Sequence, residues 1–189
     1  MTRPASTTLP VRRTTGTGLA QGLIETPLGP LTALAGDAGL MGLWFDRQQH
    51  GPGALEVPVD DEQRWIAQAR AELALYFAGR LHAFAVALAP QGTPFQEAVW
   101  TRLCAIRCGD TSSYGRIARA VGSPQASRAV GAAVGRNPIS IIVPCHRVIG
   151  ENGTLTGYAG GLERKQALLD IEGIVLPPGA RHQAQASLL

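Results

Sequence analysis

The sequence predicts a two-domain protein of the α+β class. Short apolar runs separated by Gly and Pro turns fill the first half, helical periodicity fills the second, and Ala89-Pro90-Gln91-Gly92 links them. The chain of 189 residues is long enough for two small domains. We place the N-terminal domain at residues 19–91 and the C-terminal domain at 92–176, between a disordered basic arm at 1–18 and a flexible tail at 177–189.

The first half is predicted to form a small α+β unit. A helix should begin at Asp60 or Asp61 and end near Gly79, with an apolar face that includes Trp65, Leu73 and Tyr76. We find no catalytic constellation in this half. The predicted strands cover residues 22–26, 31–35 and 40–45, separated by turns at 27–30 and 36–39, with a loop at 50–58 and a further candidate strand at 81–88.

The second half begins with a well-marked helix. Thr93 is a predicted N-cap, Pro94 occupies the first helical position, and Gln96 completes a capping box. Cys104 and Cys108 stand four residues apart near its end, a spacing that suits either a metal pair or two core thiols. We favour core thiols, because no third or fourth ligand lies near them in the sequence.

Two short helices follow and form a helix-turn-helix signal. The first begins at Ser113 and ends at Gly122, and the second runs from Gln125 to about Gly135. Arg128 is the only long side chain among the Ala and Gly residues of the second helix. Small residues suit close packing against another helix, and a narrow helix with one cation also suits the minor groove of DNA.

Charge is unevenly divided along the chain. Residues 19–91 contain eight acidic residues and four arginines, a net charge of −4, whereas residues 92–176 contain nine basic and six acidic residues, a net charge of +3. A solvated charged surface is the simplest explanation, but this division also suits phosphate contact by the second half alone.

The compartment is predicted from what the chain lacks. No apolar run approaches the ~20 residues of a membrane span. No signal-peptide core follows the N-terminus, and the Arg- and Thr-rich arm resembles a disordered segment more than a transit peptide. The three cysteines are an odd number, which argues against a disulfide framework. We therefore expect a cytoplasmic protein with no membrane contact.

The strongest chemical signal lies at Cys145 and His146. The apolar run at residues 139–143 predicts a buried strand that ends at Pro144, so the thiol should sit at the mouth of this strand. A thiolate is the attacking form of cysteine, and histidine titrates near neutral pH. Neighbouring side chains of an extended segment point to opposite faces, so any coupling should run through a turn or a water. The alternative is an inert core thiol.

Pro144-Cys145-His146-Arg147-Val148 resembles the active-site segment of the O6-alkylguanine-DNA alkyltransferases, most closely the constitutive bacterial type. The resemblance spans residues 93–176, and the first half agrees only in layout. It implies a ribonuclease-H-like α/β N-terminal domain and a mainly helical, winged helix-turn-helix-like C-terminal domain. The other matching motifs are Ser113-Tyr114, Ser127-Arg128-Ala129-Val130-Gly131, Arg136-Asn137-Pro138, Gly157-Tyr158-Ala159-Gly160-Gly161 and Ile171-Glu172-Gly173.

The resemblance implies direct-reversal DNA repair by a methylated-DNA–protein-cysteine methyltransferase. Such a protein binds double-stranded alkylated DNA through the minor groove as a monomer and flips out the damaged nucleotide. It transfers the alkyl group of O6-alkylguanine, or of O4-alkylthymine, to Cys145 without a cofactor. Water has no carbonyl to attack in the resulting thioether, so each molecule should act once.

The resemblance also assigns roles to single residues. Catalysis falls to Cys145, to His146 acting through a water, to Glu172 behind it, and to Asn137, which bridges the DNA-binding helix and the site. Glu172 has independent support, because it closes a predicted helix at 162–172, where the macrodipole disfavours an acid by ~0.3–1 kcal/mol.

Substrate and DNA contacts are implied in the same way. Tyr114 should lend its hydroxyl to a guanine ring nitrogen, the Cys145 carbonyl and the Val148 N–H should recognise the exocyclic amine, and the backbone at Tyr158, Ala159 and Gly160 should close the pocket. Arg128 should fill the space of the flipped nucleotide. The implied DNA-contacting residues are Ser113, Gln125, Arg128, Ala129, Gly131 and Arg136.

We expect no structural metal, although some relatives hold a zinc ion in the N-terminal domain. No Cys precedes Cys104, and only His50 and His82 lie upstream of it. Two other functions are compatible with parts of the pattern, namely a DNA-binding module without chemistry and a Cys-dependent hydrolase. A hydrolase needs a base that reaches the sulfur directly, which the adjacency of Cys145 and His146 disfavours.

Overall fold

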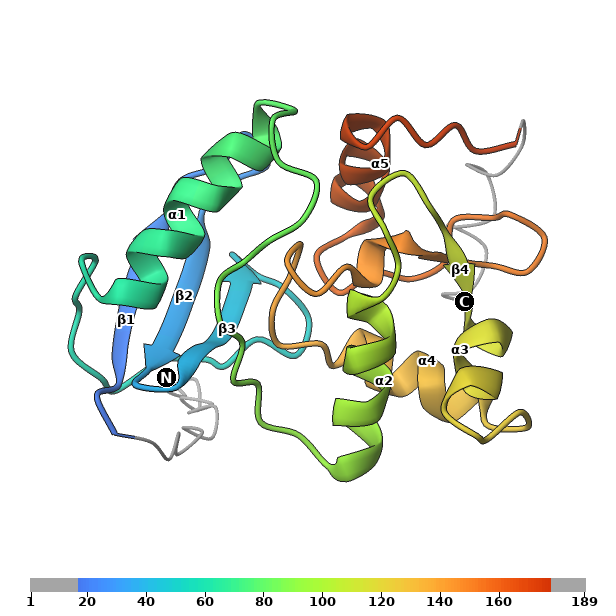
Figure 1. Cartoon of the computed structure of the whole chain (residues 1–189), viewed down its shortest axis with the longest axis horizontal. Helices are drawn as coiled ribbons and strands as arrows, with labels where there is room; N and C mark the ends of the chain where they lie inside the picture. The colour runs from blue at the N-terminus through green and yellow to red at the C-terminus, as the bar shows by residue number, and fades with distance from the viewer. Residues whose placement is uncertain (1–16, 178–189) are drawn as a thin grey trace, which may run out of the picture.

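The computed structural model describes residues 17–177, which form two lobes joined by an extended segment (Figure 1). The N-terminal lobe is an antiparallel sheet in the order β1-β2-β3 with one helix packed on it, and the C-terminal lobe is mainly helical, so the predicted two-domain α+β class is confirmed. The first lobe contains β1 (Ala20–Ile24), β2 (Leu31–Gly36), β3 (Gly39–Phe45) and α1 (Arg64–Phe77). The second contains α2 (Pro94–Cys104), β4 (Ser112–Ser113), α3 (Tyr114–Ala120), α4 (Ser127–Gly135), the 3₁₀ turn η1 (Cys145–Arg147), β5 (Val148–Ile149) and α5 (Leu162–Ile171).

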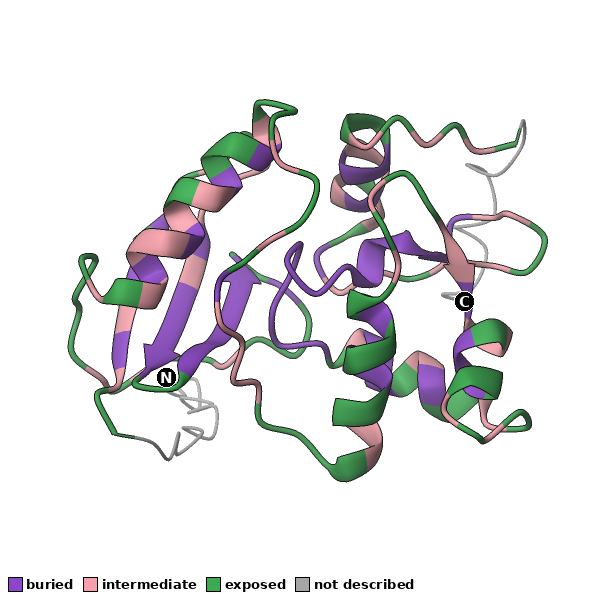
Figure 2. Cartoon of the chain, in the orientation of Figure 1, coloured by how far each residue is buried: buried purple, intermediate pink, exposed green. Residues whose placement is uncertain are grey.

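Both faces of the sheet are covered, which explains why every residue of β3 is buried (Figure 2). Alternate side chains of a strand point to opposite faces. On one face Leu43 belongs to the main core with Ile66 of α1, and on the other Trp44 joins a smaller cluster against Leu55 of the following loop. The three strands predicted at 22–26, 31–35 and 40–45 are present, with boundaries that differ by up to two residues at each end.

Two predictions in this lobe were wrong in detail. Helix α1 begins at Arg64 and not at Asp60 or Asp61, because the side chain of Gln63 caps the first turn by accepting two backbone N–H groups. Residues 81–88 do not form a strand: a single bridge joins Leu88 to β3, and Glu72 of α1 accepts the N–H groups of residues 85 and 86.

Helices α2 and α3 start where the capping signals place them. The Thr93–Gln96 capping box is present at α2, and the Ser113 hydroxyl caps α3 by accepting the N–H of Arg116. Gly122 adopts φ 73° in the turn that separates α3 from α4, a conformation that glycine tolerates without strain. Helix α4 begins two residues later than predicted. The helix-turn-helix expected from the sequence is thus the α3–α4 pair.

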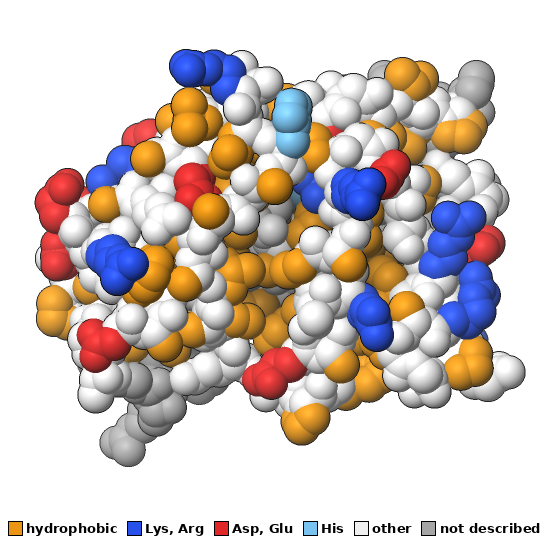
Figure 3. All heavy atoms as spheres, in the orientation of Figure 1, with side chains coloured by type: hydrophobic (Ala, Val, Ile, Leu, Met, Phe, Trp, Pro, Cys, Tyr) orange, Lys and Arg blue, Asp and Glu red, His pale blue; other side chains and the backbone are white. Residues whose placement is uncertain are grey.

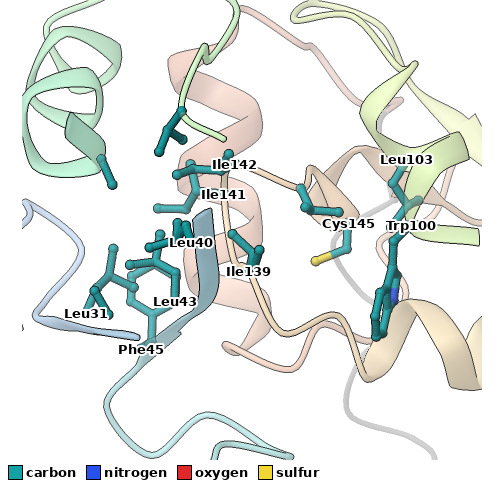
Figure 4. Close-up of a cluster of buried hydrophobic side chains, with 14 of the residues drawn as sticks. Leu31, Leu40, Leu43, Phe45, Trp100, Leu103, Ile139, Ile141, Ile142 and Cys145 are labelled. Carbon is teal, nitrogen blue, oxygen red and sulfur yellow. The ribbon is translucent and has the colours of Figure 1, made fainter. Parts of the chain in front are cut away.

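The apolar segment 139–143 is a folded loop and not the predicted strand. It makes one bridge with β3, in which the Leu43 N–H donates to the Pro138 carbonyl and the Ser140 N–H donates to the Leu43 carbonyl, both at 2.8 Å. Ile141 adopts φ 69°, unusual for a β-branched residue, and this reverses the chain. Figure 4 shows the resulting loop between β3 and Cys145. The N-terminal lobe therefore supports the segment that leads to the thiol.

The molecular surface reflects the charge division of the sequence. Figure 3 shows Lys and Arg side chains gathered at the edge of the helical lobe near β4 and α3. Arg116 and Arg119 of α3 and Arg128 of α4 are all exposed. Within residues 17–177, none of the helices has the length and apolar character that crossing a membrane requires.

Candidate active site

Cys145 is the first residue of η1 and is buried, with 5% of its surface exposed. The expectation that it lies at the mouth of a strand was wrong, because residues 139–143 form a loop and the thiol is buried. Its backbone N–H donates to the Val143 carbonyl at 2.8 Å, which fixes the turn. In Figure 4 its side chain lies between Ile139 of that loop and Trp100 of α2.

Asn137 connects the end of the helix-turn-helix to the thiol. It follows Arg136, the C-cap of α4, and is 3% exposed. Its Nδ2 amide lies 2.8 Å from the Val143 carbonyl, 3.2 Å from the Ile139 carbonyl and 3.0 Å from Cys145 Sγ, while its Oδ1 accepts the Ile139 N–H at 3.0 Å. The amide thus replaces the hydrogen bonds that a neighbouring strand would supply and directs a donor at the sulfur.

Glu172 is the centre of a buried hydrogen-bond network that includes His146. Helix α5 ends at Ile171, so Glu172 is its C-cap, and the carboxylate is fully buried. His146 Nε2 lies 2.9 Å from Oε1, and Arg147 donates from Nη2 to Oε1 and from Nε to Oε2, each at 2.8 Å. Tyr76 of α1 donates its hydroxyl to Oε1 at 2.8 Å. These donors offset the unfavourable helix dipole at this position.

The electrostatics indicate a resting site in which the thiol and the imidazole are both neutral. Burial raises the pKa of Cys145, although the Asn137 hydrogen bond and the charge of Lys165 act in the opposite direction. Burial lowers the pKa of His146 against the opposing effect of Glu172. Burial also tends to raise the pKa of Glu172, but hydrogen bonds from His146 and Arg147 prevail and lower it to about 2. A thiolate therefore has to be produced by proton transfer to a base.

Lys165, which the sequence analysis did not single out, is a buried cation close to the site. It lies in α5, and its Nζ donates to the Val148 carbonyl at 2.6 Å and to the Thr156 carbonyl at 2.9 Å. Burial lowers its pKa from 10.5 to about 8, while the charge of a Cys145 thiolate raises it. Lys165 thus joins two backbone segments near Cys145 and favours a thiolate. A lysine on a predicted helix is normally solvated, so the sequence carried no signal for it.

The predicted substrate contacts lie around the two-stranded β4–β5 pairing. This pairing sets Ser113 beside Ile149 and so brings Tyr114 close to η1. The Tyr114 hydroxyl lies 2.9 Å from Thr156 Oγ1, and burial raises its pKa, which keeps it a donor. The Val148 N–H donates to the Cys145 carbonyl within the 3₁₀ turn, so these two groups bind each other here.

The segment from Tyr158 to Gly160 is held against the N-terminal lobe. The Ala159 carbonyl accepts the Gln49 N–H at 3.0 Å. A Cβ at Gly160 would lie 2.7 Å from the Tyr158 ring and 3.0 Å from the Phe45 ring, so only glycine fits there. Arg164, at the start of α5, donates to the Gly160 carbonyl and to the N-terminal lobe, and its guanidinium stacks over Phe45. This wall of the site is built by both lobes.

The predicted DNA-contacting residues separate into an exposed group and a group that is buried or half-buried. Gly131, which is half-buried, faces the Tyr114 ring, and Ser113 is buried as the N-cap of α3, so these two have structural roles in this geometry. The exposed members are Gln125, Arg128, Ala129 and Arg136, all in or beside α4.

The other two cysteines are not core thiols, and that expectation was wrong. Cys104 is exposed and Cys108 is half-buried, with its sulfur 3.7 Å from His82 Nδ1. Both line a cavity of about 650 Å³ between the lobes. Within residues 17–177, no group of three or more His, Cys, Asp and Glu side chains is arranged to hold a metal ion.

Comparisons with known proteins identify relatives of both lobes. The profile of "6-O-methylguanine DNA methyltransferase, ribonuclease-like domain" matches residues 19–90, and that of "6-O-methylguanine DNA methyltransferase, DNA binding domain" matches residues 94–174. A methylated-DNA–protein-cysteine methyltransferase of Methanosarcina acetivorans is 51% identical over 80% of this chain and 96% of its own length. A methylated-DNA–protein-cysteine methyltransferase of Mycobacterium tuberculosis is 48% identical over 79% of this chain and 89% of its own length.

Solved structures agree with these sequence relatives. The crystal structure of Mycobacterium tuberculosis OGT in complex with DNA has a TM-score of 0.74 at 47% identity, and covers 81% of this chain and 92% of that one. The Mycobacterium tuberculosis O6-methylguanine methyltransferase structure has a TM-score of 0.74 at 46% identity, and covers 82% of this chain and 92% of that one.

Proposed function

Because this chain belongs to the family of 6-O-methylguanine DNA methyltransferases, we propose that it repairs alkylated DNA by transferring the alkyl group of O6-alkylguanine to Cys145. The activity is direct reversal by a methylated-DNA–protein-cysteine methyltransferase, and it extends in this proposal to O4-alkylthymine. The observation that carries the residue assignment is the buried arrangement in which Asn137 donates to the Cys145 sulfur while His146 binds Glu172.

Activation of the thiol uses the ring nitrogen of His146 that faces away from Glu172. Nε2 is bound to the carboxylate, so its hydrogen points there and Nδ1 is the basic position. His146 Nδ1 is buried and has no partner among the described residues. A water between Sγ and Nδ1 carries the thiol proton to the imidazole, and Glu172 stabilises the imidazolium that forms. Asn137 and Lys165 stabilise the thiolate.

Transfer then proceeds by displacement at the alkyl carbon. The Cys145 sulfur forms a bond to this carbon as the bond from carbon to O6 breaks, and the electron pair moves into the guanine ring. Tyr114 donates its hydroxyl hydrogen to a ring nitrogen and so neutralises the charge that develops there. The His146 imidazolium then releases its proton to solvent and Tyr114 regains one from solvent, so the net transfer is of one proton from the thiol to the restored guanine and no cofactor is needed. The product thioether is stable to water, and each molecule acts once.

Base recognition is assigned to backbone groups around this thiol. The Cys145 carbonyl, which has a second lone pair beside its bond to the Val148 N–H, accepts the exocyclic amine of guanine. Release of that internal bond would free the Val148 N–H for the base as well. The backbone of residues 158–160 closes the other side of the pocket.

DNA enters along the exposed side of α4. The small residues of this helix suit the minor groove, and Arg128 occupies the gap left by the flipped nucleotide. Gln125, Ala129 and Arg136 complete this surface. Gly131 lies against the ring of Tyr114, the residue that meets the flipped base. The protein acts as a monomer, in the cytoplasm where the chromosome lies.

A stoichiometric transfer assay tests the proposed function. Duplex DNA with a labelled O6-methylguanine should transfer one methyl group per protein molecule, and mass spectrometry should place it on Cys145. Cys145→Ser should transfer none yet bind DNA within several-fold of wild type, because a neutral hydroxyl is a far weaker nucleophile than a thiolate. An adduct on Cys104 or Cys108 would overturn the assignment. Binding without transfer would indicate a DNA-binding module, and multiple turnovers on esters a hydrolase.

A further inference from the structure

Tyr76 connects the N-terminal lobe to Glu172 by a side-chain hydrogen bond. It lies in α1 and is 2% exposed. Its hydroxyl crosses the boundary between the lobes and donates to Glu172 Oε1 at 2.8 Å, the same oxygen that His146 contacts at 2.9 Å. The two donors therefore share one carboxylate oxygen, although 96 residues of sequence separate Tyr76 from Glu172.

Packing alone does not account for the hydroxyl. The Tyr76 ring meets Phe77 edge-on, with centroids 5.3 Å apart, and lies 5.4 Å from Phe84. A phenylalanine would make both ring contacts. A buried tyrosine hydroxyl needs a hydrogen-bond partner, and this one finds the carboxylate that the His146 imidazole requires. Burial above all raises the pKa of Tyr76, so it remains a donor.

We propose that Tyr76 is a positioning residue of the alkyl-transfer site, through which the N-terminal lobe holds Glu172 in place and limits the negative charge that Glu172 offers to His146. This inference rests on the proposed function and adds to it a role for α1. A donor that binds a carboxylate oxygen withdraws charge from the other hydrogen bonds at that oxygen. Loss of the hydroxyl should therefore make His146 more basic.

The other charged and titratable groups around Tyr76, Glu172 and His146 come from several elements and remain in place when only the Tyr76 hydroxyl is removed. They are Arg147 and Cys145 of η1, Lys165 of α5, Cys108 in the loop after α2, and His82 beside Cys108.

The pH dependence of single-turnover transfer tests this role. With neutral His146 as the base, the acid limb of the rate profile reports its protonation. Tyr76→Phe should move this limb upward by about half a pH unit, a loss of rate that approaches threefold at pH values well below the pKa of His146 and disappears at pH 8.5. Phe84→Leu is the matched control: it removes ring packing but keeps the hydroxyl, so it should lower the melting temperature without moving the limb.

A second variant tests the hydroxyl without removing it, so that its result does not depend on how well Tyr76→Phe folds. Site-specific incorporation of 3-fluorotyrosine at position 76 keeps the ring and makes the hydroxyl a stronger donor, so the acid limb should move downward. An unchanged limb in both hydroxyl variants, or an equal movement in Phe84→Leu, refutes the role of Tyr76. Wild-type protein that forms no adduct on Cys145 would refute the proposed function instead, and the two failures are thereby distinguished.

Discussion

Replacing Glu172 by Gln keeps the shape of the side chain and removes its charge at the centre of the buried network. The carboxylate is fully buried and accepts hydrogen bonds from His146, Arg147 and Tyr76. A glutamine amide has one acceptor oxygen, and its NH₂ group would face a donor. Arg147, whose side chain is 7% exposed, would lose its only ion-pair partner among the described residues.

The expected loss of stability is given by two arguments that share the Arg147–Glu172 ion pair. The pKa of Glu172 falls from 4.5 to about 2, and at about 1.4 kcal/mol per unit this corresponds to about 3 kcal/mol. Leaving a buried arginine without its partner costs about 3–5 kcal/mol. Because the pKa is lower in the folded protein, this stabilisation is present above about pH 4.5 and is lost as the pH falls toward 2.

Denaturant unfolding of Glu172→Gln measures this loss, with Glu163→Gln as the control. Glu163 lies exposed in the first turn of the same helix, so the control makes the same chemical change and should alter the free energy of unfolding by less than about 0.5 kcal/mol. Glu172→Gln should cost about 3 kcal/mol at pH 7 and progressively less below pH 4.5. Equal unfolding midpoints for the two variants would refute the network argument.

The same variant should slow transfer per folded molecule by about 10²-fold or more at pH 7, the usual contribution of general acid–base catalysis. Partial recovery at high pH is expected, because hydroxide can then deprotonate the thiol without His146. A single-turnover rate equal to that of wild type at pH 7 would remove Glu172 from the mechanism.

The remaining predictions concern two cations. Arg128→Ala should slow repair of duplex DNA at least about tenfold, because flipping costs a few kcal/mol, yet leave reaction with free O6-alkylguanine unchanged; equal losses on both substrates would contradict a role in flipping. Lys165→Met should raise the pKa of Cys145 and slow transfer about tenfold at pH 7. Its deficit should shrink above about pH 8, where wild-type Lys165 loses its own charge, and a deficit independent of pH would contradict this account.

Capping residues and apolar periodicity predicted the helices of the C-terminal lobe well, because both signals depend only on residues three or four positions apart. The Thr93–Gln96 capping box and the Ser113 cap are both present. The loop at 139–143 was predicted incorrectly as a strand, since an apolar run indicates burial but not which partner completes its hydrogen bonds. Here the partner is the Asn137 side chain, which the sequence alone could not place beside the Ile139 and Val143 carbonyls.

The sequence predicted those residues of the candidate site to which the family resemblance gives a role, and not the residues that support them. Cys145, His146, Asn137 and Glu172 come together as the resemblance implied. Tyr76, Arg147 and Lys165 were not assigned a role, because each acts through a tertiary contact: a helix face seen in the sequence does not show which residue will meet a carboxylate from another segment.

The burial of Cys145 opposes formation of the thiolate, since burial raises the pKa of the thiol. Oxidants and adventitious electrophiles attack the thiolate, so a neutral thiol is protected from them. That protection matters for a nucleophile that can be used only once. The groups that favour the thiolate, Asn137 and Lys165, come from two different segments. The proposed base, His146, is bound to Glu172, which residues of both lobes hold. The site thus combines an unreactive resting thiol with fixed groups that stabilise the thiolate when an alkylated base enters.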